Sequence, residues 1–462
     1  MRDVPSVDQL LRTDVGRELR SVVGIRRLTN IARAVTAEIR ALVQDDPEAL
    51  AATGDTASVL LAEAVKRMEV SARRESQAGI KSVINATGVL LHTNLGRAPL
   101  SESARAAVDE AARYCSVEYD LESGGRGGRA ARVESLLKDL TGAEDALAVN
   151  NCAAAALLIL TVLARDGETI VSRGELVEIG GDFRVPDVMA SSGTRMVEVG
   201  TTNRTHLEDY RRAVNPGTRL IMRVHPSNYR IVGFVSSPER SELSTLAREA
   251  GVPLYEDAGS GQLTDLHKYG VFDEPVVREI VESGVDVVSF SGDKLLGSAQ
   301  AGLIVGTSAI VSRLRKHPLY RALRSDKLRL AALEATLVSH QRGVADAEIP
   351  AIQMLALTAD EIEQRARSLV RSVGPGRLQL ELIAGESALG GGAGPTSTFP
   401  TTLIAITHQD KSAQEIEHRL RTSSTPIISR ISEGKVLLDL RTVFPDELGV
   451  LQEGLQTLTT GS

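Results

Sequence analysis

The chain has 462 residues, of which 42% are hydrophobic and 24% are charged, a balance that excludes a disordered protein. It is longer than the about 250–300 residues at which a single core stops growing, so we expect two or three domains. The formal net charge of -7 excludes a surface that is basic throughout, although it allows a local basic patch.

Cys115 and Cys152 are the only cysteines, too few for a disulfide framework or a four-thiolate zinc site, and we expect no metal. No apolar run approaches the about 20 residues that cross a bilayer, and the N-terminal segment lacks the apolar stretch of a signal peptide. These exclusions predict a soluble cytoplasmic protein without membrane contact.

Residues 1–80 are predicted to form a helical N-terminal domain. Apolar residues recur at helical spacing over 28–43 and 58–75, and 45–58 is predicted to be a loop. The first forty residues are locally positive. The ordinary interpretation is a solvated helix face, and the sharper one is contact with a phosphate backbone. The arginines concerned are Arg12, Arg17, Arg20, Arg26, Arg27, Arg33 and Arg40.

Residues 81–335 alternate short β-branched runs with amphipathic helical segments, which predicts a large α/β domain with a mostly parallel sheet. In such open sheets, ligands bind outside the carboxyl ends of the strands. Helices are expected at 132–142 and 241–251. Strands are expected within 81–88, 145–150, 168–174, 194–200, 218–225, 252–259, 285–293 and 302–306.

A long helical region is predicted from about 319 to 372, and residues 336–462 are predicted to form a smaller C-terminal α/β domain. Its expected strands lie within 378–386, 397–408 and 427–443, with a helix at 414–423. The run Gly390–Pro395 is predicted to be a loop inside this domain.

Common nucleotide, metal and hydrolase motifs are missing from the sequence: there is no phosphate-binding P-loop, H-E-x-x-H helix, C-x-x-C pair or G-x-S-x-G elbow. The glycine-rich run Ser123–Arg129 is interpreted as a surface loop, with phosphate contact as a weaker possibility.

The strongest chemical signal is Lys294, just beyond the apolar strand at 287–291. A lone lysine in such a loop is more often an ordinary surface residue. However, a preceding strand ends in Asp257, whose carboxylate is suited to the pyridinium nitrogen of pyridoxal phosphate. An aspartate at one strand end, a helix, and a lysine after the next strand is the order found in aspartate-aminotransferase-like enzymes, pyridoxal-phosphate fold type I.

Such a fold needs a phosphate-binding helix N-terminus, and Asn151, Cys152 and Ala153 supply one between a strand and an alanine-rich helix. Alone, this piece would be read as a capped helix. Arg321 and Arg324 lie about one helical turn apart and, together with Arg97, are candidates for an oxyanion clamp.

Several long segments resemble the bacterial selenocysteine synthases, the family of L-seryl-tRNA(Sec) selenium transferases. They include INATGVLLHTNLGRAPL, EYDLESGGRGGR, RVHPSNYRIVGF, EDAGSGQL and SFSGDKLLGSAQAGLIVG. The resemblance runs through essentially the whole chain. Cys152 departs from it, since a further Asn or a small residue is expected there, and the loop at Gly124–Gly128 is richer in glycine than expected.

The resemblance implies a role for each matching residue. Lys294 would form the internal aldimine with pyridoxal 5'-phosphate and Asp257 would pair with the pyridine nitrogen. Asp293 would support the selenium-transfer site. The remaining implied roles are binding of selenophosphate by Arg97, Arg321 and Arg324, and a subunit contact at Thr201 and Thr202.

The same resemblance implies the reaction and the partners. The serine hydroxyl of seryl-tRNA(Sec) would be eliminated, and selenium from selenophosphate would add to the aminoacrylyl intermediate. The N-terminal domain would bind the tRNA, and the family assembles as a ring-shaped homodecamer, a pentamer of dimers, with active sites between subunits. The acid that assists hydroxide departure is left open: His225, also a candidate cofactor contact, and bound phosphate are the candidates.

Two alternatives stay open at this point. One is a pyridoxal-phosphate ammonia-lyase or dehydratase acting on a small phosphorylated amino sugar acid, although such relatives tend to lack the helical N-terminal domain. The other is a non-catalytic tRNA-binding protein, against which the presence of Lys294 and Asp257 argues.

Overall fold

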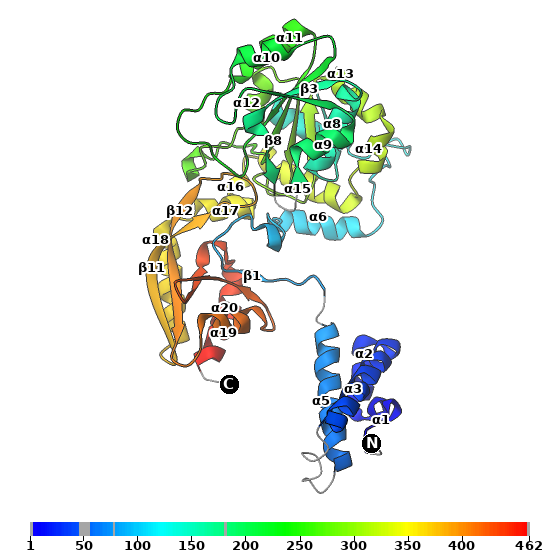
Figure 1. Cartoon of the computed structure of the whole chain (residues 1–462), viewed down its shortest axis with the longest axis vertical. Helices are drawn as coiled ribbons and strands as arrows, with labels where there is room; N and C mark the ends of the chain where they lie inside the picture. The colour runs from blue at the N-terminus through cyan, green and yellow to red at the C-terminus, as the bar shows by residue number, and fades with distance from the viewer. Residues whose placement is uncertain (1–2, 46–55, 77–78, 180–182, 460–462) are drawn as a thin grey trace. The chain divides into compact units, whose positions relative to one another are not determined.

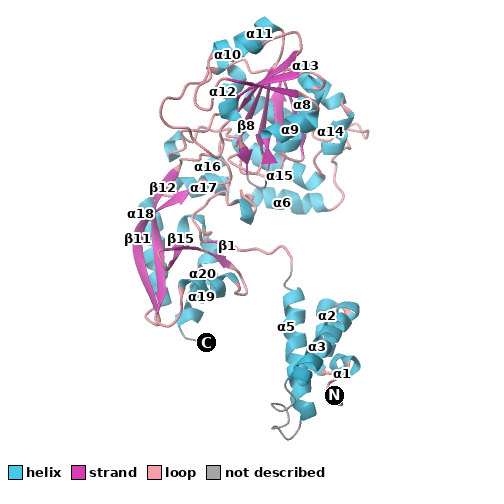
Figure 2. Cartoon of the chain, viewed as in Figure 1, coloured by secondary structure: helices cyan, strands magenta, loops and turns pink. Residues whose placement is uncertain are grey.

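The computed structural model describes residues 3–45, 56–76, 79–179 and 183–459. The chain divides into two compact units, Met1–Ser82 and Val83–Ser462 (Figures 1 and 2). The division into three domains, with a further boundary near residue 335, stays a prediction.

The first unit is a bundle of helices around a small core of its own. Leu10, Leu28, Ile39 and Met68 are fully buried in that core because apolar side chains recur every three or four residues. The helices predicted at 28–43 and 58–75 are confirmed, whereas 46–55 of the predicted loop lie outside the described residues. The described helices are α1 (Val7–Arg12), α2 (Asp14–Val23), α3 (Ile25–Asp45) and α5 (Thr56–Ser76).

The second unit is built on a seven-stranded sheet. Strands β6, β3, β7, β8 and β9 run parallel, and β10 is antiparallel to both of its neighbours, β9 and β2. This confirms the predicted α/β fold with a mostly parallel sheet. In spatial order the strands are β2 (Asp145–Val149), β10 (Gly302–Gly306), β9 (Val287–Ser291), β8 (Leu254–Gly259), β7 (Thr218–Val224), β3 (Glu168–Ser172) and β6 (Arg195–Val199).

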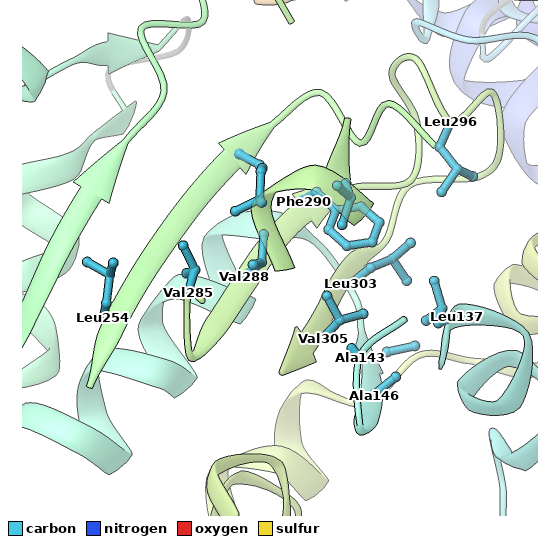
Figure 3. Close-up of a cluster of buried hydrophobic side chains, with 14 of the residues drawn as sticks. Leu137, Ala143, Ala146, Leu254, Val285, Val288, Phe290, Leu296, Leu303 and Val305 are labelled. Atoms are coloured by element: carbon cyan, nitrogen blue, oxygen red, sulfur yellow. The ribbon is translucent and has the colours of Figure 1, made fainter. Parts of the chain in front are cut away.

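Helices cover both faces of this sheet, so its strands are apolar on both sides. On one face, Val288, Phe290, Leu303 and Leu137 belong to one cluster of buried apolar side chains (Figure 3). The helices on this face are α7 (Ala131–Thr141), α11 (Arg240–Ala250), α12 (Val277–Glu282) and α15 (Lys327–Gln341). The other face is covered by α8 (Cys152–Ala164), α9 (Val185–Ser192) and α13 (Ser308–Lys316).

The C-terminal part of this unit has a separate antiparallel sheet in the order β11, β12, β15, β14. Its strands are β11 (Leu378–Ala388), β12 (Thr398–His408), β14 (Arg430–Ser432) and β15 (Lys435–Asp439), and its helices are α18 (Ala359–Val373), α19 (Ala413–Arg421) and α20 (Leu448–Thr459). An early strand, β1 (Ile84–Asn85), pairs in parallel with β13 (Ile427–Ile428), so the segment after residue 82 is tied to this C-terminal part.

The helical region predicted from 319 to 372 is interrupted. The side chain of Asp326 caps the start of α15, proline at the first position of α17 starts another helix, and Gly343, with a positive φ, follows the end of α15. The segments are α14 (Pro318–Leu323), α15, α16 (Ala345–Glu348), α17 (Pro350–Ala356) and α18. The remaining elements are α6 (Glu102–Ala112), α10 (Leu207–Ala213) and a hairpin of β4 (Glu178–Ile179) with β5 (Phe183–Arg184).

Among the described residues, no helix combines the length and apolar character needed to span a bilayer.

Candidate active site

Two neighbouring strands deliver the two central side chains. Asp257 lies near the end of β8, and Lys294 follows the end of β9 by three residues; Asp257 pairs in register with Ser289 of β9. Both side chains line a cavity of about 240 Å³. The other lining residues are Arg97, Asn151, Cys152, Ala153, Ile179, Gly259, Ser291, Asp293 and Gln300.

The amine of Lys294 is buried, with only 4% of the residue exposed. Its Nζ donates a hydrogen bond to the carbonyl of Gly392 at 3.1 Å. The turn that carries it is fixed by backbone bonds, since the N–H of Leu295 donates to the carbonyl of Ser260 at 3.1 Å. A lysine held in this way is not the solvated surface residue that an isolated motif would suggest.

Asp257 is half-buried, and its carboxylate has no ion-pair partner among the described residues. Burial raises its pKa, while the N–H of Gly259, 3.2 Å from Oδ1, and the nearby Lys294 ammonium oppose that rise. A carboxylate of this kind is stabilised by a positively charged nitrogen placed beside it. The site therefore fits a protonated pyridine ring next to Asp257.

The thiol of Cys152 supports this carboxylate. Sγ lies 3.5 Å from Asp257 Oδ1 and 3.8 Å from the hydroxyl of Ser289. Burial raises the pKa of the Cys152 thiol well above its usual range, and the negative charge of Asp257 raises it further. Cys152 is therefore a neutral donor to Asp257 and not a nucleophile.

The first turn of α8 lies beside the lysine at the wall of the same cavity. The side chain of Asn151 caps the helix by accepting the N–H of Ala154 at 2.8 Å, while Cys152 and Ala153 line the cavity. Gly302 of β10 packs directly against this turn: a Cβ there would lie 2.1 Å from the carbonyl oxygen of Asn151. A helix N-terminus of this kind binds phosphate through its free N–H groups, so these residues fit pyridoxal phosphate.

Arg97 stands in the same cavity, held by Asp293. Its Nη1 lies 2.8 Å from Asp293 Oδ2, and the backbone N–H of Ala98 donates to the Asp293 carbonyl at 3.3 Å. Arg97 also adopts a positive φ of 63°. This pairing with the residue just before Lys294 therefore places a guanidinium in the lysine cavity.

Three predicted site residues do not line this cavity. His225 lines a neighbouring cavity of about 280 Å³. Arg324 lies 3.4 Å from Glu118, which also pairs with Arg129. Arg321 is exposed, and it has no ion pair within the described parts of the chain. The roles assigned to these residues stay predictions.

Several residues that line or close the lysine cavity were not among the predicted site residues. Ser291 was part of the recognised lysine motif and could have been inferred from its spacing. Gln300 and Ile179 carry no motif. The Gly390–Pro395 run was predicted only as a loop, yet it supplies the carbonyl that holds Lys294.

These features define a pyridoxal-phosphate-dependent enzyme of fold type I. They are a buried lysine after one strand, an aspartate on the neighbouring parallel strand, and a helix N-terminus suited to a phosphate. The family model described as SelA: L-seryl-tRNA selenium transferase matches residues 83–444. The chain belongs to this L-seryl-tRNA selenium transferase family.

Curated relatives extend the similarity over almost the whole chain. The chain is 46% identical to the L-seryl-tRNA(Sec) selenium transferase of Geobacter sulfurreducens, over 99% of each protein. It is also 46% identical to that of Moorella thermoacetica, over 97% of this chain and 94% of the relative. A solved structure of D-glucosaminate-6-phosphate ammonia-lyase superposes with a TM-score of 0.58 at 22% identity, over 84% of this chain and 98% of that one, which shows a shared fold alone.

Replacing Asp257 by Asn is predicted to stabilise the apoprotein at pH 7 while weakening cofactor binding. Because the folded-state pKa of Asp257 is raised, the unfolded chain loses this proton first as the pH rises, and the free energy of unfolding falls through that window. The amide of the Asp257→Asn variant avoids this cost but also lacks the charge for a pyridinium. Urea unfolding at pH 7 and at acid pH, together with cofactor titration, measures both effects.

Asp286→Asn is the matched control, because Asp286 accepts a backbone N–H from Leu254 at the opposite end of β8. It should give no gain in stability and no loss of cofactor affinity. An Asp257→Asn apoprotein that is less stable than wild type at pH 7, with unchanged cofactor affinity, would refute the role given to this carboxylate.

Proposed function

We propose that this chain converts L-seryl-tRNA(Sec) into L-selenocysteyl-tRNA(Sec), with pyridoxal 5'-phosphate as cofactor and selenophosphate as selenium donor. The observation that carries the proposal is the cavity shared by Lys294 and Asp257 in a chain 46% identical to such transferases over 99% of its length. We also propose that the protein acts in the cytoplasm, because aminoacyl-tRNA is used there.

Each residue of the cavity has a chemical task in this reaction. When bound, pyridoxal phosphate supplies an electrophilic aldehyde and a ring that accepts electron density from the substrate's Cα. The α8 N-terminus would hold its phosphate, and Asp257 would keep the ring nitrogen positively charged. The Lys294 amine would take the proton from Cα.

During selenium transfer, the Cβ–O bond of the serine is replaced by a Cβ–Se bond. The Cβ–O bond breaks and the hydroxyl leaves as water after receiving a proton. Selenium then forms the Cβ–Se bond while Lys294 returns the proton to Cα, and water cleaves the Se–P bond to release phosphate. Arg97, fixed by Asp293, would hold the anionic donor in the cavity. His225 and the bound phosphate remain the candidates for the acid.

We further propose that Arg321 and Arg324 complete the donor site of another copy of the chain in a ring-shaped homodecamer, with Thr201 and Thr202 at a subunit contact. All four lie outside the lysine cavity, and Arg321 is exposed and available to a partner. Active sites shared between subunits would explain why only Arg97, of the three predicted arginines, lines the lysine cavity within one chain.

The N-terminal unit has a helix face suited to tRNA. Arg26, Arg33 and Arg40 follow one another every seven residues on α3, so they share one face over about 21 Å. All three are exposed, and none forms an ion pair with a carboxylate in the described residues. Arg27, by contrast, is held by Glu75 of α5 through two bonds of 2.8 Å. Arg26, Arg33 and Arg40 are therefore the better candidates for phosphate contacts.

The two alternatives have weaker support. The likeness to the amino-sugar-acid lyase rests on 22% identity and concerns the fold. A non-catalytic tRNA-binding role leaves the buried lysine and the aspartate beside it without a purpose.

Conversion of serylated tRNA(Sec) tests the proposal directly. Purified cofactor-loaded protein, incubated with selenophosphate, is expected to yield a selenium-labelled aminoacyl-tRNA, whereas Lys294→Ala should yield none. Turnover of a phosphorylated amino sugar acid, without conversion of the tRNA substrate, would overturn the proposal in favour of a lyase. Absence of turnover on either substrate by cofactor-loaded protein would favour the non-catalytic role.

Reversing the charges of Arg26, Arg33 and Arg40 to Glu should weaken tRNA binding at least about tenfold and lower the salt dependence by about two to three ion equivalents. The cofactor absorbance should not change. The matched control reverses Arg12, Arg17 and Arg73, which already face carboxylates in the same unit. Equal losses in both triple variants would refute a specific role for the α3 face.

A further inference from the structure

A loop of glycines covers the lysine. Gly390, Gly391, Gly392 and Gly394 all adopt positive φ between 50° and 75°, which side chains rarely allow. A Cβ on Gly391 would also lie 2.7 Å from the carbonyl oxygen of Leu91. This backbone path brings the Gly392 carbonyl to within 3.1 Å of the Lys294 amine.

The loop is anchored by two consecutive acidic residues that precede α12. Glu274 Oε1 accepts the N–H of Gly394 at 2.5 Å, and Asp273 Oδ2 accepts the hydroxyl of Thr396 at 2.6 Å. The two anchors differ in burial: the side chain of Glu274 is completely buried, whereas that of Asp273 is 39% exposed. Glu274 is therefore the buried anchor of the glycine loop, and Asp273 is the partly exposed one.

Glu274 also faces His225. Nε2 of His225 lies 3.3 Å from the same Oε1, and the backbone N–H of His225 donates to the carbonyl of Asp257 at 2.9 Å. Within the described residues, Oε2 of Glu274 has no hydrogen-bond partner. One side-chain oxygen, Oε1 of Glu274, therefore contacts both the Gly394 N–H of the glycine loop and the His225 ring.

We propose that Glu274 is a positioning residue of the lysine site: it fixes the glycine loop through Gly394 and thereby places the Gly392 carbonyl on the Lys294 amine. His225 packs against the same carboxylate and links it to the Asp257 strand. The Lys294 amine is therefore aligned from the C-terminal loop as well as from the sheet. This role concerns the lysine and the cofactor, and it holds whichever amino acid substrate the enzyme takes.

The proposal depends on the reach of the Glu274 side chain more than on its charge, and two variants separate these properties. Glu274→Gln keeps an oxygen at the same reach for the Gly394 N–H but removes the charge. Glu274→Asp keeps the charge but is one methylene shorter. Asp273→Asn is the matched control, because Asp273 bonds the same loop two residues further on, at Thr396.

The readout is the rate at which apoprotein forms its lysine adduct after pyridoxal phosphate is added, followed by absorbance without substrate. Loss of a buried hydrogen bond to a charged acceptor should slow Glu274→Asp by about tenfold or more. Glu274→Gln and Asp273→Asn should stay within about threefold of wild type. Amide exchange at Gly394 should accelerate in Glu274→Asp and stay protected in Glu274→Gln.

Two results would overturn the proposal. A Glu274→Asp variant that forms the adduct at the wild-type rate would show that the Gly394 bond does not align the amine. A Glu274→Gln variant as slow as Glu274→Asp would assign the effect to charge instead of reach. Thermal unfolding of each apoprotein checks that the variants are folded. If Glu274→Asp does not fold, a Glu274→Gln variant outside the threefold limit, or with an unprotected Gly394, still overturns the proposal.

Discussion

The structure depends on keeping one ammonium and one carboxylate in the same buried cavity without joining them in a salt bridge. β8 and β9 are parallel neighbours, so their carboxyl ends lie together and bring Asp257 and Lys294 to one wall. Each group has its own hydrogen-bond partner: the amine binds the Gly392 carbonyl, and the carboxylate binds the Gly259 N–H. Both groups therefore remain available to one ligand, which can react with the Lys294 amine and place a positively charged atom beside the Asp257 carboxylate.

Three parts of the second unit, far apart in sequence, converge on this pair. The sheet carries the charges, the first turn of α8 offers N–H groups for a phosphate, and the glycine loop from the C-terminal region closes over the amine. Close packing fixes these parts relative to one another, since a side chain on Gly302 would collide with the turn at Asn151. The site is therefore a product of tight backbone approaches, and glycine occupies the positions where they occur.

The fold and the placement of Asp257 and Lys294 at the ends of two strands could be predicted from the sequence, because both rest on local patterns. The strands at 252–259 and 285–293 are short apolar runs between helices, and Asp257 and Lys294 follow from their ends. Contacts that depend on non-local packing were not predictable. The Gly390–Pro395 run has no local feature that places it over Lys294, and the pairing of Glu274 with Gly394 joins residues 120 positions apart. The break between α14 and α15 was missed because helical spacing continues from 319 to 341, whereas the Asp326 side chain caps a new helix within that stretch.

Borohydride reduction of the cofactor-loaded protein, followed by peptide mass spectrometry, identifies the lysine that carries the cofactor. We expect one pyridoxyl group per chain, attached to the peptide that contains Lys294, because this amine shares its cavity with Asp257 and the α8 N-terminus. A pyridoxyl group on another lysine, or none on protein saturated with the cofactor, would show that Lys294 is not the cofactor lysine.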